Sequence, residues 1–177
     1  MSQSDRGGSA VWTRHRIGDL FEISVPRNAV CTPIPNGEPA ISWTPCSVLL
    51  SISMKDPEFP SGAAPVFLAY ISVFRDRSLT SKLVLETQKK ELGFEKAVSY
   101  ELHNSKSETI NCMWSQVDEF DFQIRHYLNH HGTWELATFI AGEQPAAELS
   151  EIADRIAQSI EFICDMNYHD SIQFTGS

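Results

Sequence analysis

Residues 120–141 of the chain contain Phe120-Asp-Phe-Gln-Ile-Arg-His-Tyr-Leu-Asn-His-His-Gly-Thr-Trp-Glu-Leu-Ala-Thr-Phe-Ile-Ala141. Apolar and polar side chains alternate from Phe120 to Arg125, which is the period-two pattern of a strand with one buried face. Asn129-His-His-Gly132 has the residues of a tight hairpin turn, and an apolar run follows from Trp134. This stretch predicts two antiparallel strands, which residues from 97 onward extend into a strand meander.

Three earlier stretches also have strand patterns. Apolar side chains alternate with polar ones over 20–25 and again over 47–54, whereas 66–74 is apolar at almost every position. A strand that is apolar on both faces suits the middle of a sheet that is covered on both sides. Between the first two, residues 26–46 hold five prolines and Asn36-Gly37, so we predict a long irregular connection there.

Two segments have helical periodicity. Residues 79–92 place Val84, Leu85 and Gln88 on one stripe, and Gly93 is a suitable stop. Residues 145–163 begin with a proline in the first turn and carry apolar residues on one narrow face, opposite an acidic face with Glu148, Glu151, Asp154 and Glu161. The predicted fold class is therefore α+β, a mostly antiparallel twisted sheet flanked by a mid-chain helix and a C-terminal helix.

Length and composition predict one domain over residues 12–165, with a disordered N-terminal tail at 1–11 and a C-terminal tail at 166–177. The 177 residues carry a formal net charge of -9 and a pI near 5.1, which oppose binding to nucleic acid. No secretory signal or membrane-length apolar run occurs, so we expect a cytoplasmic protein without membrane insertion. Four scattered cysteines (31, 46, 112 and 164) favour reduced thiols, although their spacing leaves disulfides open.

Over roughly residues 17–163 the chain resembles the PsbP-like superfamily of α/β/α sandwiches. The resemblance rests on a first strand Phe-x-Ile-x-Val-Pro, a mid-chain helix, a meander ending in Trp134-Glu-Leu-Ala-Thr-Phe-Ile-Ala-Gly142 and a closing helix running to Ser159-Ile-Glu-Phe162. Members include the extrinsic photosystem II subunit, an import factor that binds the GTPase Ran, and bacterial adaptor chaperones that bind type VI secretion effectors. The resemblance implies protein binding and transfers no functional residue. The proline-rich segment 26–46 and the tail after Ile163 depart from the pattern and leave the branch open.

Catalytic and metal-site patterns are weak in this sequence. His126, His130 and His131 lie close together, but they lack the further ligand or the spacing of a metal set. We interpret His130 and His131 as a polar hairpin tip and His126 as a hydrogen-bonded residue near the core. The carboxylates of residues 118, 119 and 121 fit a solvated strand start, and no nucleophile elbow or phosphate-binding loop occurs. We therefore predict no catalytic residue, no metal and no cofactor.

Three aromatic residues are the candidate binding residues. Trp43 and Phe59 lie in proline-rich connections, and Trp114 belongs to the predicted meander. Exposed aromatic side chains are favoured anchors of protein interfaces, and long loops inside compact domains are often functional.

The leading functional hypothesis is a non-enzymatic protein-binding module, in the manner of a bacterial adaptor or chaperone of the type VI secretion kind. Its partner would be a protein, such as a secreted effector or a basic segment, and a homodimer is also allowed. One alternative is a hydrolase or metal-dependent enzyme that uses residues 126–131 with the nearby carboxylates, which must then converge in one pocket. Another is a small-molecule or lipid carrier with a large dry cavity between sheet and helices.

Overall fold

The structure, a computed structural model, describes residues 11–39, 46–55, 65–91, 96–116, 122–141 and 146–163, which form two antiparallel sheets and two helices. The elements in chain order are β1 (Trp12–Ile17), β2 (Phe21–Pro26), β3 (Val30–Pro39), β4 (Cys46–Met54), β5 (Phe67–Phe74), α1 (Ser81–Glu91), β6 (Val98–His103), β7 (Thr109–Gln116), β8 (Phe122–Asn129), β9 (Thr133–Ile140), α2 (Ala146–Gln158) and β10 (Glu161–Phe162). The large sheet has the order β3-β4-β5-β9-β8-β7-β6, and the small sheet has the order β1-β2-β10.

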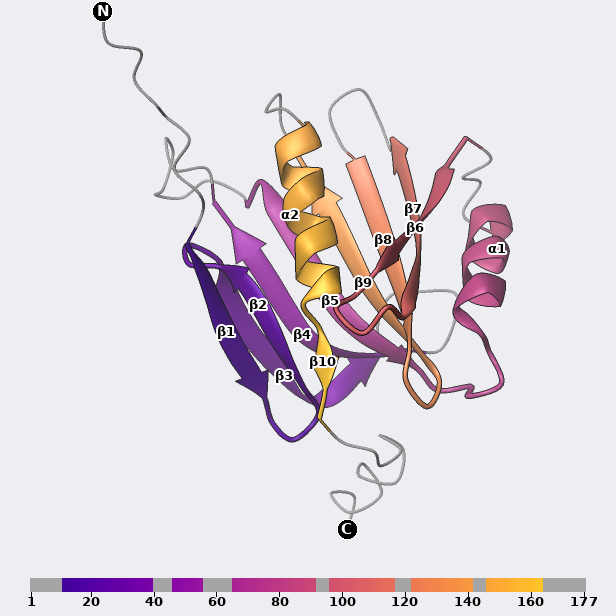
Figure 1. The fold of residues 1–177 in the computed structure, drawn as a ribbon, viewed down its shortest axis with the longest axis horizontal. Helices are drawn as coiled ribbons and strands as arrows, with labels where there is room; N and C mark the ends of the chain where they lie inside the picture. The colour runs from indigo at the N-terminus through magenta and orange to yellow at the C-terminus, as the bar shows by residue number, and fades with distance from the viewer. Residues whose placement is uncertain are drawn as a thin grey trace, which may run out of the picture.

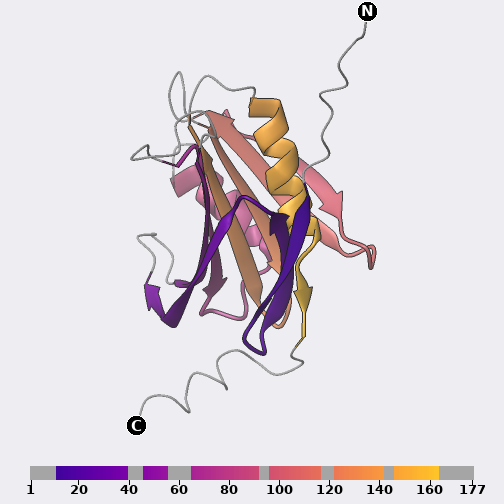
Figure 2. The same ribbon diagram turned by 90° about the vertical axis from the view of Figure 1, so that its left-hand side faces the viewer.

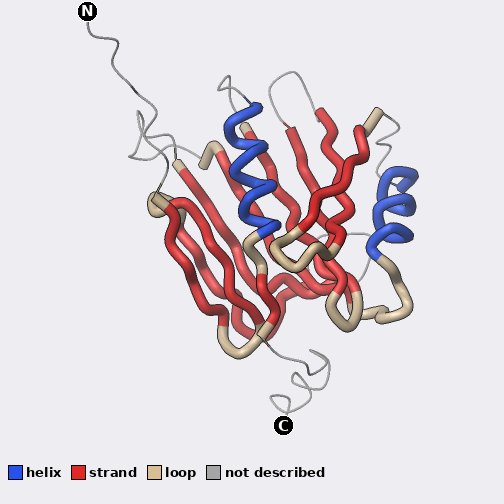
Figure 3. Tube along the Cα trace, in the orientation of Figure 1, coloured by secondary structure: helices blue, strands red, loops and turns tan. Residues whose placement is uncertain are grey.

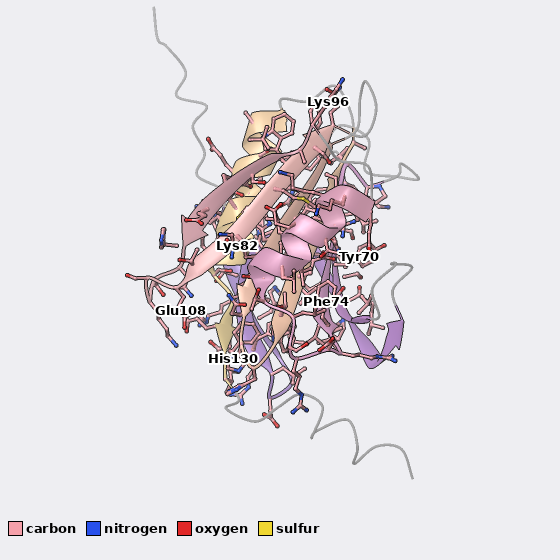
Figure 4. The ribbon with its side chains drawn as sticks, turned by 90° about the vertical axis from the view of Figure 1, so that its right-hand side faces the viewer. Tyr70, Phe74, Lys82, Lys96, Glu108 and His130 are labelled. Atoms are coloured by element: carbon pink, nitrogen blue, oxygen red, sulfur yellow. The ribbon has the colours of Figure 1, made fainter. Side chains whose placement is uncertain are left out.

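The two helices lie on opposite faces of the large sheet. Helix α2 crosses the sheet on one face and contacts β8 and β9, whereas α1 contacts β7 and β8 on the other (Figures 1 and 3). The small sheet stands on the same side as α2, as the second view shows (Figure 2). Figure 4 looks onto α1, with α2 behind the sheet. The predicted α+β sandwich, with a mid-chain and a C-terminal helix flanking a mostly antiparallel sheet, is therefore confirmed.

The main hydrophobic core lies between the large sheet, α2 and the small sheet. Strand β8 shows the division between the two faces, because Ile124 and Leu128 join this core while Tyr127, pointing the other way, packs with Val84 and Leu85 of α1. Strand β5 lies between β4 and β9, as its apolar run predicts. The hairpin between β8 and β9 is also confirmed. Its Gly132 has φ +130°, a backbone conformation that favours glycine.

A buried polar network accompanies the apolar contacts beneath α1. The Arg125 guanidinium donates a hydrogen bond to Glu135 at 3.0 Å and another to the Gln88 side chain at 3.1 Å. The Tyr127 hydroxyl also donates to Gln88, and burial raises the pKa of this tyrosine well above its usual value. Burial alone would lower the pKa of Arg125, but its interactions with Glu135 and Tyr127 together outweigh that effect and raise the pKa. The ion pair between Arg125 of β8 and Glu135 of β9 is thus buried under α1, which contributes Gln88 to the network.

The prediction of an irregular connection over 26–46 is wrong for residues 30–39, which form strand β3. Pro33 pairs with Leu50 of β4, and the register shifts between Pro33 and Glu38. Strand β3 is an edge of the large sheet, where a proline without an N–H can be accommodated because no described strand pairs with its outer side. Residues 40–45 lie outside the described residues.

The predicted C-terminal helix ends earlier than its apolar pattern suggests. Helix α2 stops at Gln158, so Ile160 and Ile163 are not helical. The Ser159 hydroxyl donates to the Ile156 carbonyl at 2.7 Å and accepts a hydrogen bond from the backbone N–H of Ser24 at 2.9 Å. Strand β10 then pairs with β2, so tertiary contacts override the helical pattern. Strand β1, for which the sequence shows no clear alternation, completes the same small sheet.

Candidate functional site

An open groove of about 460 Å³ lies between α2 and the β6 end of the large sheet. Its lining is mostly apolar. The sheet contributes Val98, Tyr100, Trp114, Phe122 and Ile124, and the helix contributes Ala147, Ser150 and Asp154. The volume is in the range of small-molecule pockets, roughly 300–1,000 Å³.

The groove exists because the sheet extends beyond the helix that covers it. The register places Val98 opposite Trp114, and Trp114 opposite Ile124, so the three side chains form one row across β6, β7 and β8. Ile124 is buried under α2, whereas Val98 is 48% exposed and Trp114 is 39% exposed. The Trp114 ring also packs against Phe122 with 6.1 Å between ring centroids. Apolar side chains at the rim therefore remain in contact with solvent.

The Asp154 carboxylate forms the polar end of the groove. Its Oδ1 atom accepts a hydrogen bond from the Tyr100 hydroxyl at 2.7 Å and lies 2.7 Å from Nε2 of His126. A carboxylate only accepts, so Nε2 of this fully buried histidine carries the proton. Burial, and secondarily the bonded carboxylate, raise the pKa of Tyr100 and keep its hydroxyl protonated. The Asp154 side chain is 27% exposed and is the only charged group of the described groove lining.

Cys112 of β7 lies between Tyr100 and His126 in the sheet. It is opposite Tyr100 of β6 on one side and His126 of β8 on the other. A cysteine, a histidine and an aspartate side by side are the residue types of a nucleophilic site. However, the Cys112 side chain is buried, and burial together with the charge of Asp154 raises the pKa of its thiol. A nucleophilic cysteine needs a lowered pKa and access to substrate, so this cluster is a structural one.

Of the predicted binding residues, Trp114 lines the groove, whereas Trp43 and Phe59 lie outside the described residues. The prediction that His126 is hydrogen-bonded near the core is confirmed. The placement of Asp154 on an outer acidic face with Glu148 and Glu151 is wrong, because Asp154 faces the sheet and lines the groove. The signal in the sequence was a tyrosine on β6 and a histidine on β8, on the same face of the sheet with β7 between them, because both need a polar partner there.

The three predicted histidines do not converge. His130 and His131 belong to the hairpin tip, and the His130 ring stacks on Phe162 with 4.2 Å between centroids. His130 comes four positions after His126 along extended chain, a separation of roughly 13 Å. The carboxylates of residues 118, 119 and 121 lie outside the described residues, and within those residues no three His, Cys, Asp or Glu side chains form a metal-binding group. The enzyme hypothesis requires these histidines to converge in one pocket, and His126 and His130 do not.

Comparison of the sequence with protein-family models and with curated proteins finds no match. Comparison of the structure finds the solution structure of cyanobacterial PsbP (CyanoP) from Synechocystis sp. PCC 6803, with a TM-score of 0.53 and 10% sequence identity. The likeness covers 92% of this chain and 98% of that chain. The chain therefore has the PsbP-like fold, and the resemblance noted in the sequence is confirmed at the level of the fold.

The helices of the described segments are too short and too polar to cross a membrane.

Proposed function

We propose that this protein is a non-enzymatic protein-binding module and that the groove beside α2 is its binding surface. The observation that carries the proposal is the exposed row of Val98 and Trp114, at the rim of an apolar groove next to a sheet edge. Large apolar side chains that stay exposed beside a concave surface mark interaction sites, and tryptophan is enriched among the residues that dominate binding energies.

The finer role we propose is that of a cytoplasmic adaptor or chaperone that holds a segment of another protein. The PsbP-like fold and the open groove support this role. The thiols of Cys31 and Cys112 are free, which supports a reducing compartment. A secreted effector is the partner we favour, and Trp43 and Phe59 stay predicted binding residues.

The groove and the opposite face of the sheet offer a matched pair of variants. Trp114 and Phe139 are both aromatic and both 39% exposed. Trp114 lies on the α2 side, whereas Phe139 contacts Tyr70 on the α1 side of the sheet. Replacing either by alanine removes a similar exposed surface, so a difference between the two variants reports on the groove itself.

The test is affinity capture from the native lysate with the tagged wild type, Trp114→Ala and Phe139→Ala, after circular dichroism has shown that all three fold. A photo-crosslinking residue at position 98 then identifies the contacted segment by mass spectrometry. We expect one dominant protein that the wild type and Phe139→Ala retain and that Trp114→Ala loses. Equal recovery of that protein by the wild type and both variants would overturn the groove as its binding surface. A crosslink to a small molecule only would overturn the proposal and favour the carrier hypothesis.

A further inference from the structure

Strand β6 is an edge of the large sheet, with outward backbone groups that only partly find partners among the described residues. Among the described strands it pairs with β7 alone. The Asn104 N–H donates to the Glu108 carbonyl at the hairpin between β6 and β7, and backbone bonding alternates along an antiparallel pair. The N–H and C=O groups of Ser99, Glu101 and His103 therefore point away from β7. Consistent with this direction, the His103 carbonyl accepts a hydrogen bond from the Gln158 side chain of α2 at 2.9 Å.

The two edges of the large sheet differ in how they are protected. Edge strand β3 contains prolines and a register shift, features that discourage the addition of another strand. Edge strand β6 has the sequence Val-Ser-Tyr-Glu-Leu-His, without a proline. No described residue bonds to the outward backbone groups of Ser99 and Glu101. Strand β6 thus offers a short template that ends where Gln158 bonds to His103.

The side chains of β6 connect this edge to the groove. Val98 and Tyr100 line the groove, whereas Ser99 between them faces the α1 side, where its hydroxyl accepts a hydrogen bond from Lys89. A strand added beside β6 would place every second side chain in the groove. Those side chains would meet an apolar lining with one charge, the Asp154 carboxylate, in a chain of net charge -9. Such a surface suits apolar side chains and one cation.

We propose that an extended segment of a partner protein adds to β6 as a further strand, with apolar side chains at alternate positions and a lysine or arginine that binds Asp154. This inference deepens the proposed function and rests on it. The backbone of Ser99 and Glu101 supplies the main-chain hydrogen bonds, and the groove supplies the selectivity. Binding by strand addition takes its affinity from the main chain and its specificity from alternate side chains.

The probe is a phage-displayed library of random linear peptides, selected against the full chain. Glu101→Pro removes one outward N–H while β6 keeps its bonds to β7, and Glu101→Ala separates that effect from loss of the side chain. We expect selected peptides that alternate apolar residues around a lysine or arginine. Their synthetic forms should lose about tenfold or more in affinity for Glu101→Pro and stay within about twofold for Glu101→Ala, as measured by fluorescence anisotropy.

The cation is tested in the peptide as well as in the protein, since Asp154 also supports Tyr100 and His126. Exchange of the selected lysine for norleucine should weaken binding to the wild type about tenfold and leave binding to Asp154→Asn nearly unchanged. Equal losses on both proteins would overturn the contact with Asp154. Thermal melts of each variant show whether the fold is retained.

The remaining outcomes separate this inference from the proposed function. One outcome is that the selected peptides bind Glu101→Pro as well as the wild type but no longer bind Trp114→Ala. This result would support binding in the groove and overturn strand addition. Failure to select any peptide above background would also overturn strand addition, whereas capture of the native partner tests the proposed function separately. If size-exclusion chromatography shows a dimer that Glu101→Pro dissociates, the occupant of the edge is a second copy and the inference is wrong.

Discussion

Nε2 of His126 on strand β8 lies 2.7 Å from Oδ1 of Asp154 on helix α2, and this contact joins the buried sheet to the wall of the groove. Asp154→Ala would leave the His126 and Tyr100 donors without their acceptor, and the His126 ring is fully buried. We expect the variant to lower the free energy of unfolding by about 2 kcal/mol. Urea denaturation followed by circular dichroism measures the change. Glu151→Ala, at an exposed position of the same helix, is the control and should change it by less than about 0.5 kcal/mol.

The buried pair of Arg125 and Glu135 should matter far more than an exposed pair of the same length. Both Arg125–Glu135 and Arg16–Asp19 are 3.0 Å long, but the first pair is almost buried and the second is exposed. Glu135→Ala leaves an uncompensated buried guanidinium, so we expect a loss of about 3–5 kcal/mol. Asp19→Ala should cost at most about 0.5 kcal/mol. Similar losses in chemical denaturation would show that burial does not strengthen the inner pair.

Stability should fall at high pH because Tyr100 keeps its proton in the folded state. Its pKa lies above the value of about 10 in the unfolded chain, mainly through burial and then through its bond to Asp154. The contribution of the protonated Tyr100 hydroxyl to folding stability is complete below about pH 10 and is lost as the pH rises further. Above that pH the unfolded chain releases the hydroxyl proton, whereas the folded chain keeps it. Tyr100→Phe should give a shallower decline between pH 9 and about pH 11 in urea titrations. An unchanged decline would contradict the role of Tyr100.

Cys112 should resist alkylation in the folded protein. Its thiol is buried, and burial raises its pKa, so little thiolate forms and reagents do not reach it. Cys31 is the internal comparison, because it is only partly buried. With iodoacetamide at neutral pH, peptide mass spectrometry should find Cys31 modified well before Cys112, and urea should remove the difference. Rapid native modification of Cys112 would revive a reactive-cysteine role.

Much of the fold follows from local patterns in the sequence, and the exceptions have tertiary causes. Strands β2 and β4 bury one face more deeply than the other, which produces a visible alternation, and α1 has a buried stripe. Strand β8 alternates in sequence although both of its faces are covered, because its α1 face includes polar residues such as Gln123 and Arg125. Strand β3 has no such pattern, because an edge position tolerates prolines that would exclude it from the sheet interior. The end of α2 at Gln158 depends on the bond between Ser159 and Ser24, a partner 135 residues away.

The candidate site was less predictable than the fold. Trp114 could be singled out as a large aromatic residue, but its neighbours in the groove come from β6, β8 and α2. Strand register decides that Val98 lies opposite Trp114, and no local pattern encodes that pairing. Asp154 occurs among other acidic residues of its helix, and only the rotation of α2 on the sheet distinguishes it from Glu151.

The pairing of β10 with β2 determines when the protein can complete its fold during synthesis. Strand β2 is made near the beginning of the chain, whereas its partner β10, the Ser159 hydroxyl and the Phe162 ring that packs on Phe21 come near the end of the described part. A ribosome that pauses before Ser159 therefore holds a nascent chain in which Phe21 lacks one of its covering rings and β2 has a free edge. This interval is when the chain is most exposed to misassociation and to capture by general chaperones.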